Sequence, residues 1–218
     1  MLTSNLKYRL ISAAFIGSVF IVAIFFLRPL FTVLMFLVAG LMLAEWYNIT
    51  ASNKGYLYSG LLIIPLPIIS VLYIAELDQQ GWLLFSFFAL IWCVDTVAMF
   101  VGKTLGGPKL VPVLSPGKTI SGLCGGVLAT SLLPLVLKLL PFYDISSYTG
   151  RISDVWLMTG FGLLALCAQL SDLFISFFKR RFGVKDSGSI IPGHGGVLDR
   201  FDSIIFTAPL VALWVVNL

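Results

Sequence analysis

The sequence predicts an all-α, polytopic membrane protein: a transmembrane helical bundle of about seven spans with a polar site on its cytoplasmic side. Hydrophobic residues make up 59% of the 218-residue chain and charged residues only 11%, whereas soluble domains carry roughly 25% charged residues. The apolar runs are continuous rather than alternating, which disfavours a transmembrane β-barrel. We expect residues 1–218 to form one integral-membrane domain, because little sequence is left over for a separate soluble unit.

Seven apolar runs are long enough to be membrane-spanning helices, each of which needs about 20 residues. They lie at about 11–27, 30–49, 57–75, 82–101, 121–141, 156–178 and 201–217. Arg28 and Pro29 separate the first two runs. Because proline cannot continue a helix, this break predicts a hairpin or a kinked pair.

The basic residues predict which loops share a side of the membrane. If the N-terminus with Lys7 and Arg9 is cytoplasmic, successive crossings place Lys54 and the loops 102–119 and 179–200 on the same side. Eleven of the fourteen lysines and arginines then lie on that side, as the positive-inside rule predicts, and the C-terminus lies outside. The two long loops can therefore converge on one site.

The densest group of charges lies between residues 176 and 203, which hold about a third of all formal charges and the only histidine. Its members are Lys179, Arg180, Arg181, Lys185, Asp186, His194, Asp199, Arg200 and Asp202. Charges beside a bilayer are costly and are usually kept for ions, substrates or catalysis. Cations and carboxylates around the flexible Pro-Gly-His-Gly-Gly segment 192–196 are a mixture that suits a polyphosphate with its metal. An ordinary interfacial loop would need only a few lysines.

One helical face near the end of the sixth run combines a carboxylate, a hydroxyl and an ammonium group. Asp172, Ser176 and Lys179 are spaced i, i+4, i+7, and residues at this spacing lie on one side of an α-helix. The pattern predicts a polar stripe that faces the site.

Three carboxylates are the predicted metal ligands. Asp199 and Asp202 are spaced i, i+3 at the start of the seventh run, and two carboxylates that close repel each other unless a cation lies between them. With Asp172 they offer the oxygen ligands that suit Mg²⁺ bound together with substrate phosphates. The alternative is a buried salt-bridge network, in which the same acids pair with Lys179 and Arg200 and only fasten two helices.

Two loops offer phosphate-binding groups. Glycines such as Gly195 and Gly196 leave backbone amides unobstructed, and such amides can bind phosphate oxygens, although a glycine-rich turn is often only a turn. His194 could bond a phosphate or a base, or be structural. In the second loop, Ser115, Lys118 and Thr119 could contact phosphates, although the Walker A spacing is missing and an ordinary basic loop is the alternative. Two further acids lie in apolar runs and are site candidates by default: Glu45 and Asp95.

The segment from Ser176 to Asp202 reads S-x-x-K-R-x4-K-D-x5-P-G-H-G-G-x-x-D-R-x-D. This pattern resembles the signature of phosphatidate cytidylyltransferases, also called CDP-diacylglycerol synthases. The resemblance extends over about residues 45–203, through Glu45-Trp46, Asp95-Thr96-x-Ala98, Gly102-Lys103, Ser115-Pro116-x-Lys118-Thr119, Gly122 and Gly125-Gly126. Three positions depart from it: Ser121 where that family commonly has Glu, Met99 where an aromatic residue is common, and Ser171 where Gly usually precedes the aspartate.

The resemblance implies a nucleotidyltransferase of phospholipid biosynthesis that joins CTP and phosphatidate to give CDP-diacylglycerol and pyrophosphate. It implies a Mg²⁺ cofactor, and a second, monovalent cation is an open addition. The implied catalytic residues are Lys179 and the metal ligands Asp172, Asp199 and Asp202. The implied substrate-binding residues are Ser176, Arg180, Lys185, His194, Gly195, Gly196 and Arg200, followed by Ser115, Lys118 and Thr119.

Other functions remain open at this point. The closest rival is another CTP-dependent lipid transferase or a lipid kinase. A cation or proton transporter with a path through Asp95, Asp172 and Asp199 is disfavoured, because the charges cluster on one side. The expected partners are CTP and phosphatidate in the bilayer, with no nucleic acid. The small residues on the late helices would allow a homodimer, and the expected location is a bacterial inner membrane with the site facing the cytoplasm.

Overall fold

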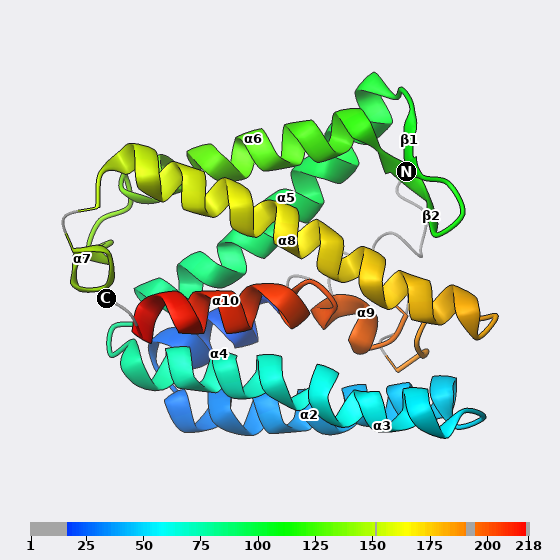
Figure 1. Ribbon diagram of the computed structural model, residues 1–218. Helices are drawn as coiled ribbons and strands as arrows, with labels where there is room; N and C mark the ends of the chain where they lie inside the picture. Colours follow the sequence, from blue (N-terminus) through cyan, green and yellow to red (C-terminus); the bar gives the residue numbers. More distant parts are fainter. Residues whose placement is uncertain (1–16, 151, 191–194, 217–218) are drawn as a thin grey trace, which may run out of the picture.

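The computed structural model describes residues 17–150, 152–190 and 195–216 (Figure 1). Residues 17–25 are helical. The helices that follow are α2 (Arg28–Thr50), α3 (Lys54–Ile63), α4 (Pro65–Leu77), α5 (Trp82–Leu105), α6 (Ile120–Leu137), α7 (Ser146–Thr149), α8 (Asp154–Arg181), α9 (Leu198–Phe201) and α10 (Ile204–Val216). Two short strands, β1 (Lys109–Val111) and β2 (Ser115–Thr119), are present as well. The predicted all-α bundle is confirmed, with this small hairpin added to it.

Five helical segments of the described part are long and apolar enough to cross a membrane: α2, α3 with α4, α5, α6 and α8. The seventh predicted run forms only the 13-residue α10, which at 1.5 Å per residue spans about 20 Å of a hydrocarbon core about 30 Å thick. The first run, 11–27, lies partly outside the described residues. The number of spans therefore stays a prediction.

Prolines determine where two of the helices begin. The predicted break at Arg28-Pro29 is confirmed, since α2 starts there with proline in its first turn, where the missing N–H is not needed. The predicted run 57–75 is instead two successive helices, because α3 ends before Pro65, which opens α4. The start of α3 is capped by Asn53, whose side chain accepts from the amides of the next turn.

The segment 102–119, predicted as a loop, contains the antiparallel hairpin. Lys109 pairs with Thr119, and Val111 pairs with Ser115. The hairpin follows α5 through Gly106, whose φ of +64° suits glycine at a helix end. It leads directly into α6, where Thr119 Oγ1 accepts from the amide of Gly122 at 3.1 Å. The hairpin that carries three predicted site residues therefore has a helix at each of its ends.

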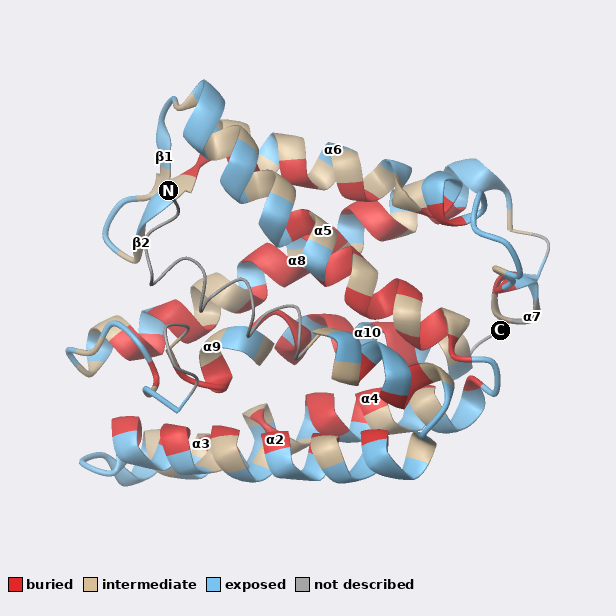
Figure 2. Cartoon of the chain, turned by 180° about the vertical axis from the view of Figure 1, so that it is seen from behind, coloured by how far each residue is buried: buried red, intermediate tan, exposed pale blue. Residues whose placement is uncertain are grey.

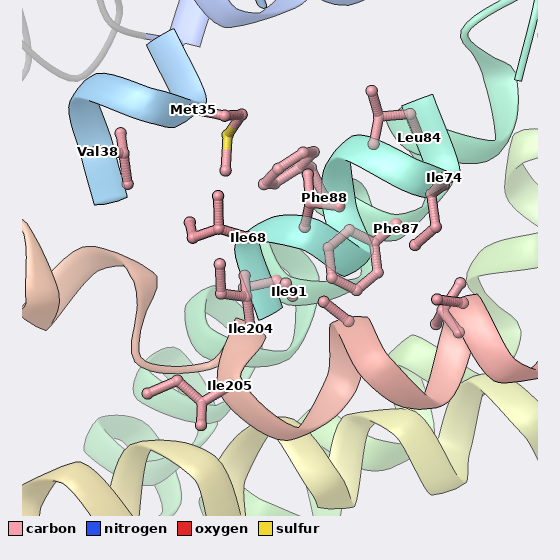
Figure 3. Packing of buried hydrophobic residues seen from close by; sticks show 14 of the residues in the cluster. Met35, Val38, Ile68, Ile74, Leu84, Phe87, Phe88, Ile91, Ile204 and Ile205 are labelled. Atoms are coloured by element: carbon pink, nitrogen blue, oxygen red, sulfur yellow. The ribbon is translucent and has the colours of Figure 1, made fainter. Parts of the chain in front are cut away.

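The helices form two groups with α10 between them (Figure 1). The helices α5, α6 and α8 pack together on one side, and α10 contacts both α8 and α4, which lies beside α2 and α3 on the other. Buried side chains from several elements meet at α10, among them Met35, Ile68, Phe88 and Ile204 (Figure 3). Exposed residues cover the outer faces of these helices (Figure 2). Many of them are large and apolar, as expected for a surface that contacts lipid.

The two basic loops lie at the same end of the bundle, as predicted. Figure 1 shows the α2–α3 turn, the hairpin and the C-terminal end of α8 at one end, with α7 and the end of α10 at the other. Arg180 near the end of α8 donates from Nε to the main-chain oxygen of Leu114 in the hairpin at 3.2 Å. A direct contact thus joins the two loops.

The close packing of α5 against α6 predicts a glycine requirement. A Cβ at Gly122 would lie 2.5 Å from the carbonyl oxygen of Ala98, a backbone atom that cannot rotate away. Gly122→Ala should destabilise the fold by about 1–3 kcal/mol, as overpacking usually does. Gly40→Ala is the control, because nothing lies within 4 Å of a Cβ there and alanine raises helix propensity by up to about 1 kcal/mol. Thermal unfolding of the purified variants in detergent measures the change in stability of each. An equal change in the two variants would contradict the close contact at Gly122.

Candidate active site

A cavity of about 470 Å³ opens where α5, the hairpin, α6, α8 and α9 meet. Six basic and five acidic side chains line it: Lys103, Lys118, Lys179, Arg180, Lys185, Arg200, Asp95, Asp172, Asp186, Asp199 and Asp202. A site for an anion alone would not need five carboxylates. The near balance of charges suits a ligand that brings both anionic groups and a cation.

Most of the predicted site residues line this one cavity. They are Ser115, Lys118, Thr119, Asp172, Ser176, Lys179, Arg180, Lys185, Asp199, Arg200 and Asp202. Gly195 and Gly196 lie beside Asp199 rather than among the lining residues: the amide of Gly196 donates to Asp199 Oδ2 at 3.1 Å. Gly195 has a φ of +84°, which glycine adopts without strain. His194 lies outside the described residues.

The predicted stripe on α8 is confirmed, since its three members face the same cavity. Ser176 Oγ donates to Asp172 Oδ1 at 3.3 Å. The other oxygen of Asp172 lies 2.6 Å from Lys118 Nζ, which comes from β2. The carboxylate of Asp172 therefore connects the stripe to the hairpin.

Lys179 and Asp199 form an ion pair between α8 and α9. Lys179 Nζ lies 2.6 Å from Asp199 Oδ1, and the two side chains are only 9% and 8% exposed. Asp199 Oδ2 accepts from the amides of Ser187 at 2.8 Å and Gly196 at 3.1 Å. Burial alone would raise the pKa of Asp199, but the hydrogen bond and charge of Lys179 and the two amides together lower it below its usual value. This carboxylate is therefore ionised at neutral pH.

Two of the three predicted metal ligands are neighbours. Asp172 and Asp202 both line the cavity, close enough for their charges to repel each other, and Asp202 is buried. Two carboxyls in that arrangement need a proton or a cation between them. Asp199 is instead bonded to Lys179 and to amides, and nowhere in the described ranges are three acidic, histidine or cysteine side chains grouped as a ready metal site. The fit to Mg²⁺ rests on Asp172 and Asp202, since that ion is often held by one or two carboxylates plus phosphates.

Gln169 joins two charged residues and was not predicted. Its Oε1 accepts from Lys118 Nζ at 2.9 Å, and its Nε2 donates to Asp95 Oδ1 at 2.8 Å. A continuous chain thus runs from Asp95 through Gln169 and Lys118 to Asp172. The position of Gln169, three residues before Asp172 in an apolar run, is the sequence signal that could have identified it.

Two predicted substrate-binding residues also hold the backbone. Arg180 donates to the main-chain oxygens of Leu114 at 3.2 Å and Val184 at 3.1 Å. Thr119 caps α6. Both line the cavity, so they shape its wall whatever they contact in a complex.

The second apolar-run acid, Glu45, lies behind the cavity rather than in it. It is 2% exposed, and its carboxylate accepts from Ser187 Oγ at 2.6 Å and from the amides of Val197 at 2.8 Å and Leu198 at 2.9 Å. Glu45 was predicted as a candidate without a role. Nothing in the sequence identified Ser187 as its partner.

Comparison with known proteins identifies the family of the chain. A model of the cytidylyltransferase family matches residues 52–218. The chain is 50% identical over 208 residues to a phosphatidate cytidylyltransferase of Rickettsia bellii, covering 95% of this chain and 90% of the relative. It is 48% identical over 210 residues to one of Rickettsia conorii, covering 96% and 91%. A Staphylococcus epidermidis protein of the same name is 43% identical over 152 residues, covering 68% of this chain and 55% of the relative. The match covers most of the chain, and the lysines and aspartates of the motif between Ser176 and Asp202 line one cavity. The chain therefore belongs to the cytidylyltransferase family.

Proposed function

We propose that this protein is a phosphatidate cytidylyltransferase, which transfers a cytidylyl group from CTP to phosphatidate and releases pyrophosphate. The observation that carries the proposal is the cavity in which Lys118 and Lys179 lie beside Asp172, Asp199 and Asp202. The names of the similar proteins support the same activity. Paired cations and carboxylates at the end of an apolar bundle are what a polyphosphate and a lipid phosphate require.

The reaction needs charge neutralisation and alignment more than a strong base. The phosphate of phosphatidate is already anionic at neutral pH, so its oxygen can attack the α-phosphorus of CTP while the bond from that phosphorus to the β-phosphate oxygen breaks. Lys179 has three N–H donors and gives one to Asp199. Its remaining donors can bind phosphate oxygens as negative charge builds up on them.

Asp172 and Asp202 are the residues proposed to hold Mg²⁺. Their neighbouring carboxyls supply hard oxygen ligands at one wall of the cavity. When bound, this ion supplies positive charge against the phosphates of the nucleotide. Asp199 is proposed to act differently from the sequence-based assignment: it keeps the Lys179 ammonium at the cavity and ties it to the segment that precedes α9.

The proposed site faces the cytoplasm of a bacterium, at the level of the lipid headgroups. Support comes from the lysines of the hairpin and of α8, which lie at the same end of the bundle (Figure 1), as cytoplasmic ends usually carry them. Apolar residues also line the cavity, among them Met99, Leu110 and Leu123. An apolar wall beside a charged one suits a substrate that is part lipid and part phosphate.

The activity is tested with purified protein in detergent, labelled CTP, phosphatidate and Mg²⁺. We expect labelled CDP-diacylglycerol and one pyrophosphate per product, and loss of both when the metal is chelated. Polyprenyl phosphate and diacylglycerol serve as alternative acceptors. Product with one of these and none with phosphatidate would instead favour another lipid transferase or a lipid kinase.

Asp202→Asn should reduce cytidylyl transfer by at least about 10²-fold, the scale on which preorganised charged groups act. The fold should persist, since the change removes one of two adjacent carboxyls. Asp154→Asn is the matched control, because Asp154 pairs with Lys138 at the opposite end of the bundle. Initial rates of both variants at saturating substrate measure the effect. Near-normal turnover of Asp202→Asn would remove this residue from the metal site.

Lys179→Met should also lower transfer by at least about 10²-fold, because it removes a cation from the cavity. It leaves the buried Asp199 without its cation, and breaking a buried pair can cost about 3–5 kcal/mol. The double variant Lys179→Met with Asp199→Asn removes that orphaned charge, so its fold should recover while its activity stays low. Lys138→Met, in the exposed pair with Asp154, is the control. Recovery of activity in the double variant would show that Lys179 only balances a charge.

A further inference from the structure

Glu45 places an ionisable side chain inside the protein, behind the wall of the cavity. Among the described residues, its hydrogen-bond donors lie before and at the start of α9: the hydroxyl of Ser187 and the amides of Val197 and Leu198. These partners lie 142 to 153 residues away in the sequence. Burying a carboxylate costs free energy unless several hydrogen-bond donors satisfy it. The bonds therefore constrain the positions of the three donors as well as that of Glu45.

The same segment is held from its other side by Asp199. Ser187 gives its hydroxyl to Glu45 and its amide to Asp199 Oδ2. Gly196 gives its amide to Asp199 Oδ2, and the next amide in the chain, that of Val197, goes to Glu45. Asp199 in turn binds Lys179. One continuous set of bonds therefore runs from α2 to the ammonium group in the cavity.

Two glycines allow this close approach. A Cβ at Gly188 would lie 2.6 Å from Glu45 Oε1, and a Cβ at Gly196 would lie 2.5 Å from Glu45 Oε2. Real Cβ atoms are essentially never found that close to an oxygen. Gly188 and Gly196 thus both approach this one carboxylate, which gives Gly196 a structural reason beyond the predicted phosphate contact.

The hydrogen bonds of Glu45 do not contribute to the packing of its own helix, α2. The helix α2 is buried through Phe31, Met35, Met42 and Trp46, and Trp46 also donates to the main-chain oxygen of Tyr56 at 2.9 Å. Within the described residues, the side-chain hydrogen bonds of Glu45 go to Ser187, Val197 and Leu198, before and at the start of α9. Its loss should shift that segment more than it shifts α2.

We propose that Glu45 is a positioning residue for cytidylyl transfer. It holds the start of α9 so that Asp199 and Asp202 face the cavity in the required register, and it acts on Lys179 only through Asp199. This inference rests on the proposed function for its kinetic consequence, whereas the bonds of Glu45 can be tested without any activity.

The test replaces Glu45 with glutamine. Both carboxylate oxygens accept hydrogen bonds, so an amide must place an N–H against at least one donor of the segment. We expect the turnover number to fall by about 10²-fold, the cost of small misplacements at a reacting centre, with the KM for CTP changed less than about threefold. Thr50→Val is the matched control, because buried Thr50 lies on the same helix and donates only to Trp46 O at 2.7 Å. It should retain normal turnover.

Hydrogen exchange in detergent supplies the second readout. In Glu45→Gln, amide exchange should accelerate in peptides that cover residues 195–203, while peptides from α2 and α5 keep the wild-type rate. Ser187→Ala should accelerate the same peptides to a lesser degree, because it removes one donor of three. If the wild-type protein shows no cytidylyl transfer, the proposed function is overturned, but the hydrogen-exchange measurement still tests the bonds of Glu45. The positioning role would be overturned by unchanged turnover of Glu45→Gln, or by faster exchange spread evenly over the whole chain.

Discussion

Each carboxylate at the end of this apolar bundle must find a cation or several donors, and the geometry of the site follows from that requirement. Asp172 forms an ion pair with Lys118 of the hairpin, and Asp199 forms one with Lys179 of α8. Glu45 accepts hydrogen bonds from one hydroxyl and two amides. Since an unpaired charge in such surroundings is expensive, these pairings constrain how α8, α9 and the hairpin meet. Within the described part of the chain, Asp202 is buried without a cation partner of this kind and lies near Asp172, which is why these two residues are the ones proposed to hold an added cation.

The pairings depend on backbone that brings distant segments close together. Gly122 lets α5 and α6 cross with almost no gap, and the hairpin between these helices then presents Lys118 toward α8. Arg180 fastens the hairpin to the C-terminal end of α8 through Leu114. The cavity is thus a product of tight helix packing on one side and of two tethered loops on the other, and neither loop could shape it alone.

The three aspartates of the motif have distinct surroundings. Asp199 is bonded to an ammonium group and two amides, which lower its pKa, whereas Asp172 contacts Lys118 and Ser176 and lies near Asp202. The sequence analysis had assigned all three to the metal site. The structure supports a division of labour, in which one aspartate orients a lysine and the other two lie together, and this division underlies the mechanism proposed for the family's reaction here.

The sequence by itself determined the helical class, the stripe on α8, the convergence of two loops and the family, because apolar length, helical periodicity and a dense motif are local properties. Only the tertiary structure decided that 102–119 folds into a hairpin, that the last apolar run yields a short helix, that Gln169 links Asp95 to Lys118, and that Glu45 holds the start of α9. The contacts of Gln169 and Glu45 join residues 51 to 153 positions apart, which local patterns in the sequence do not reveal. A buried polar group reveals that it needs partners, but which partners it receives depends on the packing of the whole bundle.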